Sequence, residues 1–386
     1  MKDVAVVGGG LIDFGEHFDM STADMAEQAY LNALSDVDDG IAPDEIEAAW
    51  YGTLDLAGDG SSGAAFSHAT GLFDIPVTRV ENACATGSTA VRNAADVVRS
   101  GRYDVVVALG VEKMRDDPGG LIAETVSHDV WRGRGISTPA LWGLRASRHM
   151  HEYGTTDEQI ARISAKNHNH GAKYPHAHYR FECDVDDVLD SPAITDPLTL
   201  FECCPVTDGA AAIVIASEDV VDEYTDDPIW LAGGGVATEN LVRPHNEALT
   251  GFRATRLAAE QAYDEAGITA EEIDVAEVHD CFAIAELLHY EDLGFCEKGK
   301  GGEYIDSGAP ELGGERPVNP SGGLLSKGHP IGATGVAQIV QLYEQLRGEA
   351  GPVQVDDVEY ALQHNLGTSP DHRGAACCIN VLTADR

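Results

Sequence analysis

Positively charged residues are scarce in this chain of 386 residues, which has 25 Lys and Arg against 65 Asp and Glu. The formal net charge of −40 would repel a nucleic acid, so we expect no nucleic-acid partner. The acidic residues occur in every segment, which favours a halophile-like adaptation, since molar salt shortens the Debye length to about 3 Å. An acidic surface made for a cationic partner is the alternative, but it predicts one acidic block.

Cysteines and long apolar runs are also few. Eight cysteines are too few for a disulfide scaffold in a chain of this length, and two pairs of them are immediate neighbours in the sequence. No stretch reaches the roughly 18 apolar residues that a membrane span needs, and the apolar start is too short for a signal peptide. We therefore expect a cytoplasmic protein with no membrane partner. With 43% hydrophobic residues, the chain can still bury a core.

An internal duplication organises the chain. The pentapeptide AEQAY at residues 26–30 returns at residues 259–263, and each copy begins an amphipathic helix that leads through an acidic turn into an apolar strand. Two copies of one α/β half are the simplest interpretation. The strands are almost continuously apolar, which indicates sheets covered by helices on both faces. The predicted strands are residues 4–7, 48–52, 77–80, 105–109, 211–216, 230–233, 275–278, 358–363 and 375–381.

The pattern is looser between the two halves. Residues 115–207 contain interspersed Gly, Pro, His and Trp, so we expect a loop insertion folded over the first half, where substrate loops usually lie. The predicted division is residues 1–114 and 208–225 for the N-terminal half, 115–207 for the inserted loop domain, and 226–386 for the C-terminal half.

Cys84 is the first candidate for chemistry. It lies between the predicted strand that ends at Val80 and a helix of small residues that begins near Ala85. A thiol there faces the unpaired amides and the positive end of the helix, which would lower its pKa and favour the nucleophilic thiolate. The same amides can hold an oxyanion. Taken alone, a cysteine in this position is more often a small core residue.

His329 is the second candidate. It lies in SKGHPIGATG, before a helix that matches the helix after Cys84 in the repeat. The pseudo-twofold symmetry of the halves would bring both residues to one central site, where the imidazole can take the thiol proton. The alternative is a histidine that only caps the helix.

Two further blocks end apolar strands. The block HDCF contains His279 and Cys281, and the turn HNLG contains His364 and Gly367. Reactive side chains at the carboxyl ends of strands are typical of active sites in α/β proteins. For the first block, a histidine bonded to a loop beside a packed cysteine is an equally good interpretation of the block in isolation.

These motifs together resemble the thiolase superfamily. ACATG, HDCF, GHPIGATG and HNLG occur in the order of that family, and the likeness runs from about residue 4 to residue 381. The HDCF block is similar to that of sterol-carrier-type and archaeal thiolases. The resemblance implies an α/β fold of duplicated halves in a layered α-β-α-β-α core. It also implies acyl transfer between coenzyme A thioesters, with no other cofactor and no metal.

The resemblance assigns roles to the site residues. Cys84 would attack an acyl-CoA and hold the acyl group as a thioester, with His329 as its base. Other thiolases carry a second active cysteine in a Cys-x-Gly turn near the C-terminus, but this chain has HNLG there. Cys281 therefore inherits the removal of the α-proton from a second acetyl-CoA, and His279 would help to stabilise the enolate. The turn at His364 and Gly367 would supply a backbone amide to the oxyanion site.

The same groups can condense two acetyl-CoA molecules to acetoacetyl-CoA or cleave a 3-ketoacyl-CoA, so the direction stays open. The likeness to archaeal members implies the acetoacetyl reaction of isoprenoid and lipid metabolism and a homodimer or homotetramer. It further implies two partners, which are a small zinc-ribbon/OB-fold protein and a hydroxymethylglutaryl-CoA synthase.

Alternative functions share this scaffold. Thiolase-fold ketoacyl synthases as a rule lack HDCF, and retro-aldolases of this fold usually lose the nucleophilic cysteine. A non-catalytic carrier of acyl-CoA or lipid is the alternative outside enzymes. A histidine-rich run suggests a metal site, but its spacings fit no standard zinc set, so none is predicted there. Its candidate ligands are His168, His170, His176, His178 and Cys183.

Overall fold

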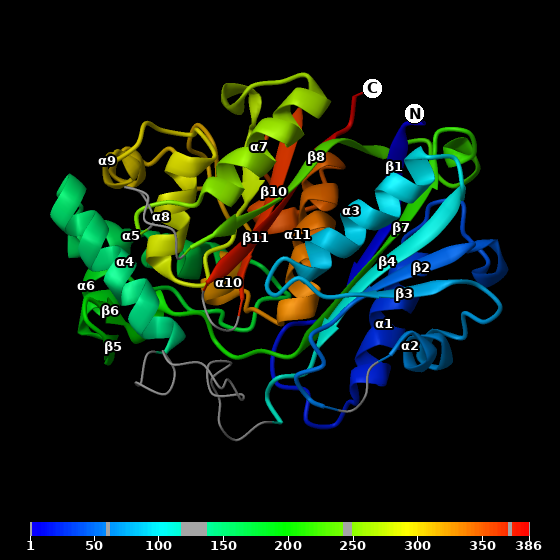
Figure 1. Cartoon of the computed structure of the whole chain (residues 1–386), viewed down its shortest axis with the longest axis horizontal. Coiled ribbons are helices and arrows are strands. Elements are labelled where there is room, and N and C mark those ends of the chain that lie inside the picture. The colour runs from blue at the N-terminus through cyan, green and yellow to red at the C-terminus, as the bar shows by residue number, and fades with distance from the viewer. Residues whose placement is uncertain (1, 59–61, 117–136, 242–248, 370–372, 386) are drawn as a thin grey trace.

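The computed structural model describes residues 2–58, 62–116, 137–241, 249–369 and 373–385. Within them, one large sheet has its strands in the order β3-β2-β4-β7-β1-β8-β11-β10-β9 and runs from one half of the molecule into the other (Figure 1). Its strands are β1 (Val4–Leu11), β2 (Ala48–Gly52), β3 (Val77–Val80), β4 (Val105–Glu112), β7 (Gly209–Ser217), β8 (Ile229–Asn240), β9 (Val275–Glu277), β10 (Tyr360–Thr368) and β11 (Gly374–Thr383). A separate hairpin is formed by β5 (Ala193–Thr195) and β6 (Leu198–Thr199).

The duplication is visible in the strand pairing. In the first half, β2 pairs parallel with β4, β4 antiparallel with β7, and β7 antiparallel with β1. In the second half, β9, β10, β11 and β8 repeat the same succession of directions. The two sets join where Ala5 of β1 lies opposite Trp230 of β8. The repeat in the sequence is therefore also a repeat in topology.

Two helices lie between the halves. α3 (Thr86–Arg99) and α11 (Ile331–Leu346) contact each other, and each contacts strands of both halves. On the other side of each half-sheet, α1 (Thr22–Ser35) covers β1 and β7, and α7 (Arg253–Ala266) covers β8 and β11. α2 (Gly63–Thr70) packs beside α1. These layers are the α-β-α-β-α core that the sequence predicts.

Alternate residues of a strand join different cores. In β4, Val106 and Ala108 belong to the apolar cluster around α3 and α11, whereas Val105 and Val107 belong to the cluster under α1. Successive side chains of a strand point to opposite faces, and here both faces are covered by helices. This double coverage is the reason for the continuous apolar runs in the sequence.

The two central helices approach each other closely at small residues. A Cβ on Gly87 of α3 would lie only 2.7 Å from the carbonyl oxygen of Gly332 in the first turn of α11. A side chain there would push apart the two helix starts, which follow the loops of Cys84 and His329. Close packing therefore explains the small residues in ACATG and GHPIGATG.

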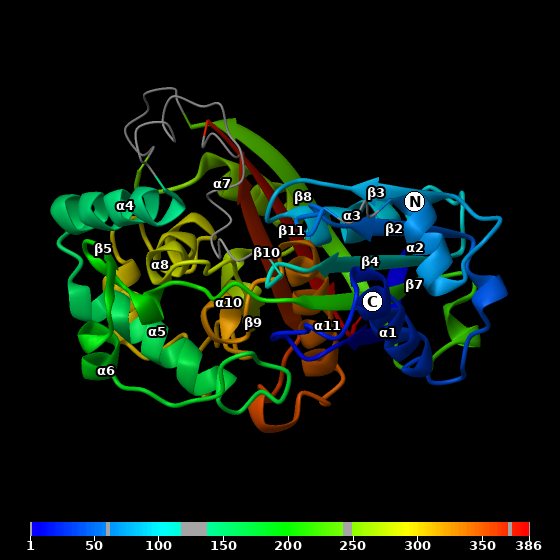
Figure 2. The same ribbon diagram turned by 90° about the horizontal axis from the view of Figure 1, so that it is seen from below.

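The insertion packs on a different part of the molecule than the sequence suggested. It contains α4 (Thr138–Tyr153), α5 (Asp157–Gly171) and α6 (Val185–Asp190). α4 and α5 contact the second half, at α8 (Ala283–Asp292), and α5 also contacts α9 (Gly301–Asp306) and α10 (Gly323–Ser326). The helices α4, α5 and α6 thus lie at the end of the molecule away from α1 and α2 (Figure 2), and for them the expected position over the first half is corrected.

Buried polar groups explain this position. Lys166 Nζ of α5 lies 2.8 Å from a carboxylate oxygen of Glu286 in α8. Asn167 of α5 donates to Glu286 at 2.6 Å and to Asp280 at 2.7 Å. Buried charges need partners, and these partners belong to the second half.

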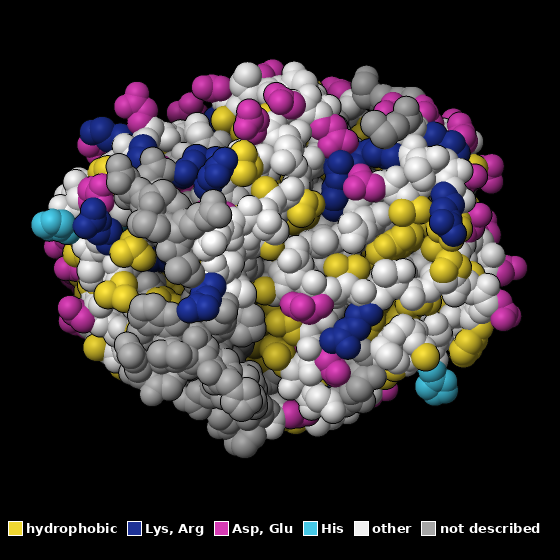
Figure 3. Space-filling view, viewed as in Figure 1, with side chains coloured by type: hydrophobic (Ala, Val, Ile, Leu, Met, Phe, Trp, Pro, Cys, Tyr) yellow, Lys and Arg dark blue, Asp and Glu magenta, His cyan; other side chains and the backbone are white. Residues whose placement is uncertain are grey.

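The surface carries its charge in a dispersed form. On the face shown in Figure 3, Asp and Glu side chains are spread widely rather than gathered into one block. Among the described residues, no helix combines the length and the apolar character that crossing a bilayer requires.

Candidate active site

Cys84 lies in a tight turn between β3 and α3. Ala83, just before it, has φ 49°, a left-handed conformation that is uncommon for a residue with a side chain. The carbonyl of Ala83 accepts from the backbone N–H of Thr86 at 3.0 Å and from the Thr86 hydroxyl at 2.5 Å. The same hydroxyl accepts from the backbone N–H of Asn82 at 2.8 Å. The turn therefore holds the thiol at the start of α3.

Two histidines lie beside this thiol. The sulfur of Cys84 and one ring nitrogen each of His279 and His329 all lie within 4.8 Å of one another. The two imidazole rings meet edge to face with their centroids 5.2 Å apart. Cys84 comes from the first half and both histidines come from the second half. The cluster therefore exists only where the halves meet.

Hydrogen bonds determine which nitrogen of His329 carries a free lone pair. The Thr334 hydroxyl donates to the carbonyl of Pro330 at 2.9 Å, so its oxygen must accept from Nδ1–H of His329, which is 2.7 Å away. Nε2 then carries the free lone pair, and it has no hydrogen-bond partner among the described residues. Burial lowers the pKa of His329 to about 3, so the ring is neutral at rest.

The resting nucleophile is a thiol. Burial, which its own backbone N–H opposes and the nearby carboxylates of Glu112 and Glu81 support, raises the pKa of Cys84 to about 12. The expectation that the start of α3 lowers this pKa is therefore wrong, because burial outweighs the backbone N–H. The proton must leave as the sulfur attacks, and the lone pair of His329 is placed to accept it.

Glu112 is a buried carboxylate near the site, and the sequence patterns did not single it out. It ends β4 and accepts from the backbone N–H groups of Leu54 at 2.9 Å, Leu56 at 3.0 Å and Gly332 at 3.2 Å. Burial raises its pKa to about 7, and these hydrogen bonds oppose that shift. Glu112 connects the loop after β2 to the start of α11. The available signal was an acid at the end of an apolar strand.

Cys281 lies near Cys84 but is deeply buried. Burial raises its pKa far above the usual range, and charge on the sulfurs of Cys204 and Cys84 raises it further, which requires the three thiols to be close. Its carbonyl accepts from the backbone N–H of Cys204 at 3.0 Å.

Asp280, the neighbour of Cys281 in the HDCF block, points elsewhere, because it accepts from the backbone of Leu324 at 2.6 Å and from Asn167 of the insertion. Of the HDCF block, His279 is thus the member in the cluster with Cys84, and the role of Cys281 stays a prediction.

The HNLG residues lie within β10 rather than in the predicted turn, and they support the site from behind. His364 accepts at Nδ1 from the backbone N–H of His279 at 3.3 Å, and its Nε2 lies 3.2 Å from the Thr255 hydroxyl. A Cβ on Gly367 would lie 2.7 Å from the backbone nitrogen of Cys84. The strand that carries both residues therefore packs directly against the nucleophile turn. Whether its amides hold an oxyanion stays a prediction.

Asn365, the second residue of the HNLG segment in β10, has a structural role that the sequence does not indicate. Its side chain accepts from the hydroxyl of Ser88 in α3 at 2.7 Å and donates to Gln338 in α11 at 2.7 Å. It points away from His364 because neighbouring residues of a strand face opposite ways. Asn365 thereby holds together the two helices that begin at the site.

The histidines of the histidine-rich run each contact a different partner. His168 lies 3.2 Å from the carbonyl of Phe201, and His170 binds the carbonyl of Asn319 at 3.0 Å. The remaining pairs are His176 with Asp13 at 2.7 Å, and His178 with Thr207 at 3.0 Å. Within the described residues, the cluster of metal-type ligands that lie within 4.8 Å of one another is instead Cys84, His279 and His329.

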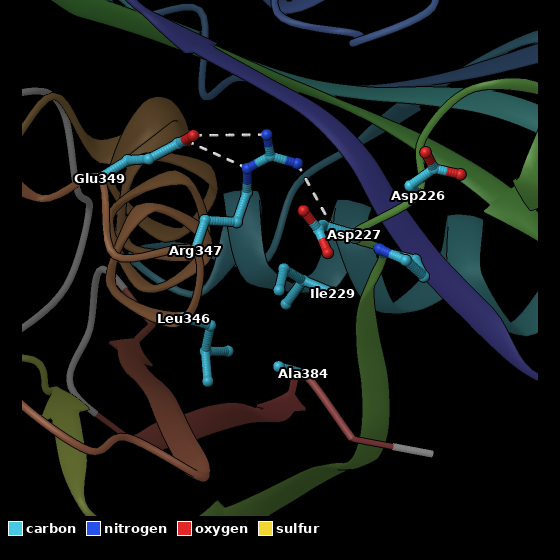
Figure 4. A pocket seen from close by; sticks show the side chains of 8 residues that line it. Asp226, Asp227, Ile229, Leu346, Arg347, Glu349 and Ala384 are labelled. Atoms are coloured by element: carbon cyan, nitrogen blue, oxygen red, sulfur yellow. Dashed lines mark hydrogen bonds and ion pairs between the residues drawn. The ribbon is translucent and has the colours of Figure 1, made fainter.

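A surface pocket elsewhere has no such chemistry. It has a volume of about 260 Å³ and is lined in part by Asp227, Leu346, Arg347 and Glu349 (Figure 4). Arg347 is held by Glu349 at 3.0 Å and by Asp38 at 3.0 Å. Its cation is thus already paired, and the pocket contains no thiol or imidazole.

Comparison with known families covers most of the chain. Residues 4–219 match the family model described as "Thiolase, N-terminal domain", and residues 233–377 match "Thiolase C-terminal domain-like". An acetyl-CoA acetyltransferase of Methanothermobacter thermautotrophicus is 42% identical in an alignment 374 residues long that covers 95% of this chain and 97% of that protein. Human sterol carrier protein 2 is 38% identical in an alignment 388 residues long that covers 95% of this chain and 70% of that protein.

Solved structures show the same fold. A structure named "Ltp2-ChsH2(DUF35) aldolase" has a TM-score of 0.85 and 26% identity, and covers all of this chain and 98% of that one. Human mitochondrial 3-ketoacyl-CoA thiolase has a TM-score of 0.72 and 18% identity, with 100% and 99% coverage, and supports the fold alone.

Proposed function

The chain belongs to the thiolase family, and we propose that it is an acetyl-CoA C-acyltransferase that works through an acetyl group on Cys84. In the first step, the sulfur of Cys84 attacks the thioester carbonyl of acetyl-CoA, and its proton passes to Nε2 of His329. Collapse of the tetrahedral adduct expels the coenzyme A thiolate, which takes up that proton. The products are acetyl-Cys84 and free coenzyme A.

In the second step, the thiol proton of Cys281 passes to Nε2 of His329, which returns it to the Cys84 sulfur when the step ends. The Cys281 thiolate removes a proton from the methyl group of another acetyl-CoA. The resulting enolate carbon attacks acetyl-Cys84, and the Cys84 thiolate leaves to give acetoacetyl-CoA. His279 and His329 hold the enolate oxygen, and the amides of Cys84 and Gly367 hold the tetrahedral oxyanion. The reverse sequence is the thiolysis of a 3-ketoacyl-CoA.

One observation carries this proposal. A thiol at a helix start has two neutral imidazoles within 4.8 Å, and one of them presents a free lone pair because Thr334 holds its other nitrogen. A nucleophile, a base and a second donor are the groups that acyl transfer needs. The acetyltransferase identity of the archaeal relative supports acetyl-CoA as the substrate.

Incubation with acetyl-CoA followed by intact-mass measurement tests the first step. We expect one acetyl group per chain on the wild-type protein, none on Cys84→Ala, and one on Cys296→Ala, which removes a partly buried cysteine outside the cluster. An acetyl adduct that persists in Cys84→Ala would contradict the proposal.

Two alternatives are separated by product analysis. A lipid or acyl-CoA carrier, as the name of the sterol carrier relative suggests, would bind acyl-CoA without forming acetyl-Cys84. An aldolase, as the name of the solved neighbour suggests, would cleave its substrate without an acyl-enzyme and would keep its activity in Cys84→Ala. Formation of acetoacetyl-CoA from acetyl-CoA distinguishes the thiolase reaction from both.

Assembly and location are also proposals. β3 is the edge of the sheet and pairs only with β2 among the described strands, so it can continue into a second copy in a homodimer. A zinc-ribbon/OB-fold protein and a hydroxymethylglutaryl-CoA synthase are the expected partners in the cytoplasm. Light scattering and co-purification from cells test these proposals.

A further inference from the structure

The catalytic cluster has the donor set of a metal site. Cys84 offers a sulfur, and His279 and His329 each offer a ring nitrogen, all within 4.8 Å of one another. Nδ1 of His279 and Nε2 of His329 are both buried and have no hydrogen-bond partner among the described residues. Buried polar atoms normally have partners, so these two unpartnered ring nitrogens indicate a site that is completed by a ligand.

The chemistry of the donors favours zinc. Three sulfur and nitrogen donors with an open fourth position are typical of zinc sites, and sulfur and imidazole donors disfavour the hard cations Mg²⁺ and Ca²⁺. Bond lengths of about 2.3 Å to sulfur and about 2.0 Å to nitrogen place such donors roughly 3.3–3.6 Å apart. The three side chains would therefore close by about 1 Å around the ion.

The surroundings favour a cation at this position. His329 is anchored by Thr334 through Nδ1, which leaves Nε2 as its metal-binding atom and fixes the ring. The Glu112 carboxylate lies near enough to Cys84 to influence its charge, and the whole chain carries a net charge of −40, so a cation is attracted.

We propose that Cys84, His279 and His329 bind one Zn²⁺ per chain when no acyl-CoA occupies the site. Binding replaces the proton of the Cys84 thiol, so that Zn²⁺ and the thiol give a Cys84 thiolate–zinc bond and one released H⁺. The bound ion is not a catalytic cofactor. It occupies the sulfur that carries the acetyl group, so zinc and acetylation exclude each other, and this inhibitory consequence rests on the proposed function.

Co²⁺ serves as the spectroscopic probe, because tetrahedral cobalt–thiolate complexes absorb in the near-ultraviolet and visible. We expect the full-length protein to bind one Co²⁺ with a thiolate charge-transfer band, and Zn²⁺ to displace it. The band should disappear in Cys84→Ala and Cys84→Ser. Loss of an outer-shell partner typically weakens metal binding by roughly 10–100-fold, and we expect His279→Ala, which removes a direct ligand, to weaken Co²⁺ binding by more than that. Cys296→Ala and His176→Ala, which remove a cysteine and a histidine outside the cluster, should bind Co²⁺ like the wild type.

A second measurement follows the sulfur directly. Zn²⁺ should slow the alkylation of Cys84 by iodoacetamide, and a chelator should restore it. A charge-transfer band that survives in both Cys84 variants, the absence of any band in the wild type, or alkylation unaffected by Zn²⁺ would overturn the proposal. Acetylation is measured separately with chelator present, so failure of zinc binding and failure of acyl transfer are distinguishable.

Discussion

A Cβ on Gly367 would lie 2.7 Å from the backbone nitrogen of Cys84. The last strands of the second half thus press directly on the nucleophile turn of the first half, although the two residues are 283 positions apart in the sequence. Ala83, next to Cys84, already has a left-handed backbone. The position of the sulfur therefore depends on how closely the two halves pack.

Gly367→Ala tests this dependence. The added methyl group must displace the Cys84 turn, and a shift of about 1 Å can cost roughly 100-fold in rate, while overpacking costs about 1–3 kcal/mol of stability. We expect slower formation of the acetyl adduct by intact-mass time course and a lower melting temperature. Gly15→Ala is the matched control, because a Cβ at Gly15 meets nothing within 4 Å. Equal adduct rates in the two variants would contradict the argument.

Thr334→Val tests the orientation of His329. Valine keeps the shape of threonine but removes the oxygen that accepts from Nδ1–H, so the ring can turn and lose the lone pair at Nε2. We expect acetylation of Cys84 to slow by about 10–100-fold, which is the usual cost of removing a partner that orients a functional histidine. Thr334→Ser retains the hydroxyl and should recover most of the rate. A valine variant as fast as the wild type would show that the hydrogen bond does not orient the base.

Lys166→Met tests the anchoring of the insertion. The substitution leaves the Glu286 carboxylate buried without its cation, a change that typically costs about 3–5 kcal/mol. We expect a lower melting temperature by calorimetry and faster proteolysis within the insertion. The double variant Lys166→Met with Glu286→Gln should recover part of the loss, because the buried charge is then gone. Arg162→Met on the same helix is the control, since its pair with Asp306 is exposed.

Salt should stabilise this protein. With 65 acidic and 25 basic residues, unscreened repulsion opposes the compact state, and the Debye length falls from about 10 Å at 0.1 M to about 3 Å at 1 M salt. We expect the melting temperature to rise steadily over that range in KCl, and similarly in NaCl because screening does not depend on the cation. A melting temperature that is independent of salt would contradict adaptation to high salt.

Secondary structure was largely predictable from local patterns. Strands β2 and β3 were predicted with their observed limits. β2 is buried along its whole length, whereas β3 (VTRV) is an edge strand in which Thr78 and Arg79 are exposed. β8 extends to Asn240, well beyond the predicted end at residue 233, since its glycines and exposed residues carry no apolar signal. The order of the motifs was enough to indicate the family.

The candidate site was predictable in its residue types but not in its electrostatics. Local reasoning from the helix start suggested a lowered pKa for Cys84, but burial raises it. Desolvation depends on which distant segments cover the thiol, and a single sequence does not contain that information. For the same reason, the hydrogen bonds from Asn365 to α3 and α11 could not be seen in HNLG.

By itself, the sequence determined the duplicated α/β architecture and named Cys84, His279 and His329, because hydrophobic periodicity and motif order are local properties of a chain. Only the tertiary structure decided that these three side chains meet within 4.8 Å, that Thr334 leaves one imidazole lone pair free, and that the insertion packs on the second half. Those outcomes depend on contacts between residues far apart in the chain. The local pattern permits several arrangements equally, and the burial of a charge or the direction of one hydrogen bond selects among them.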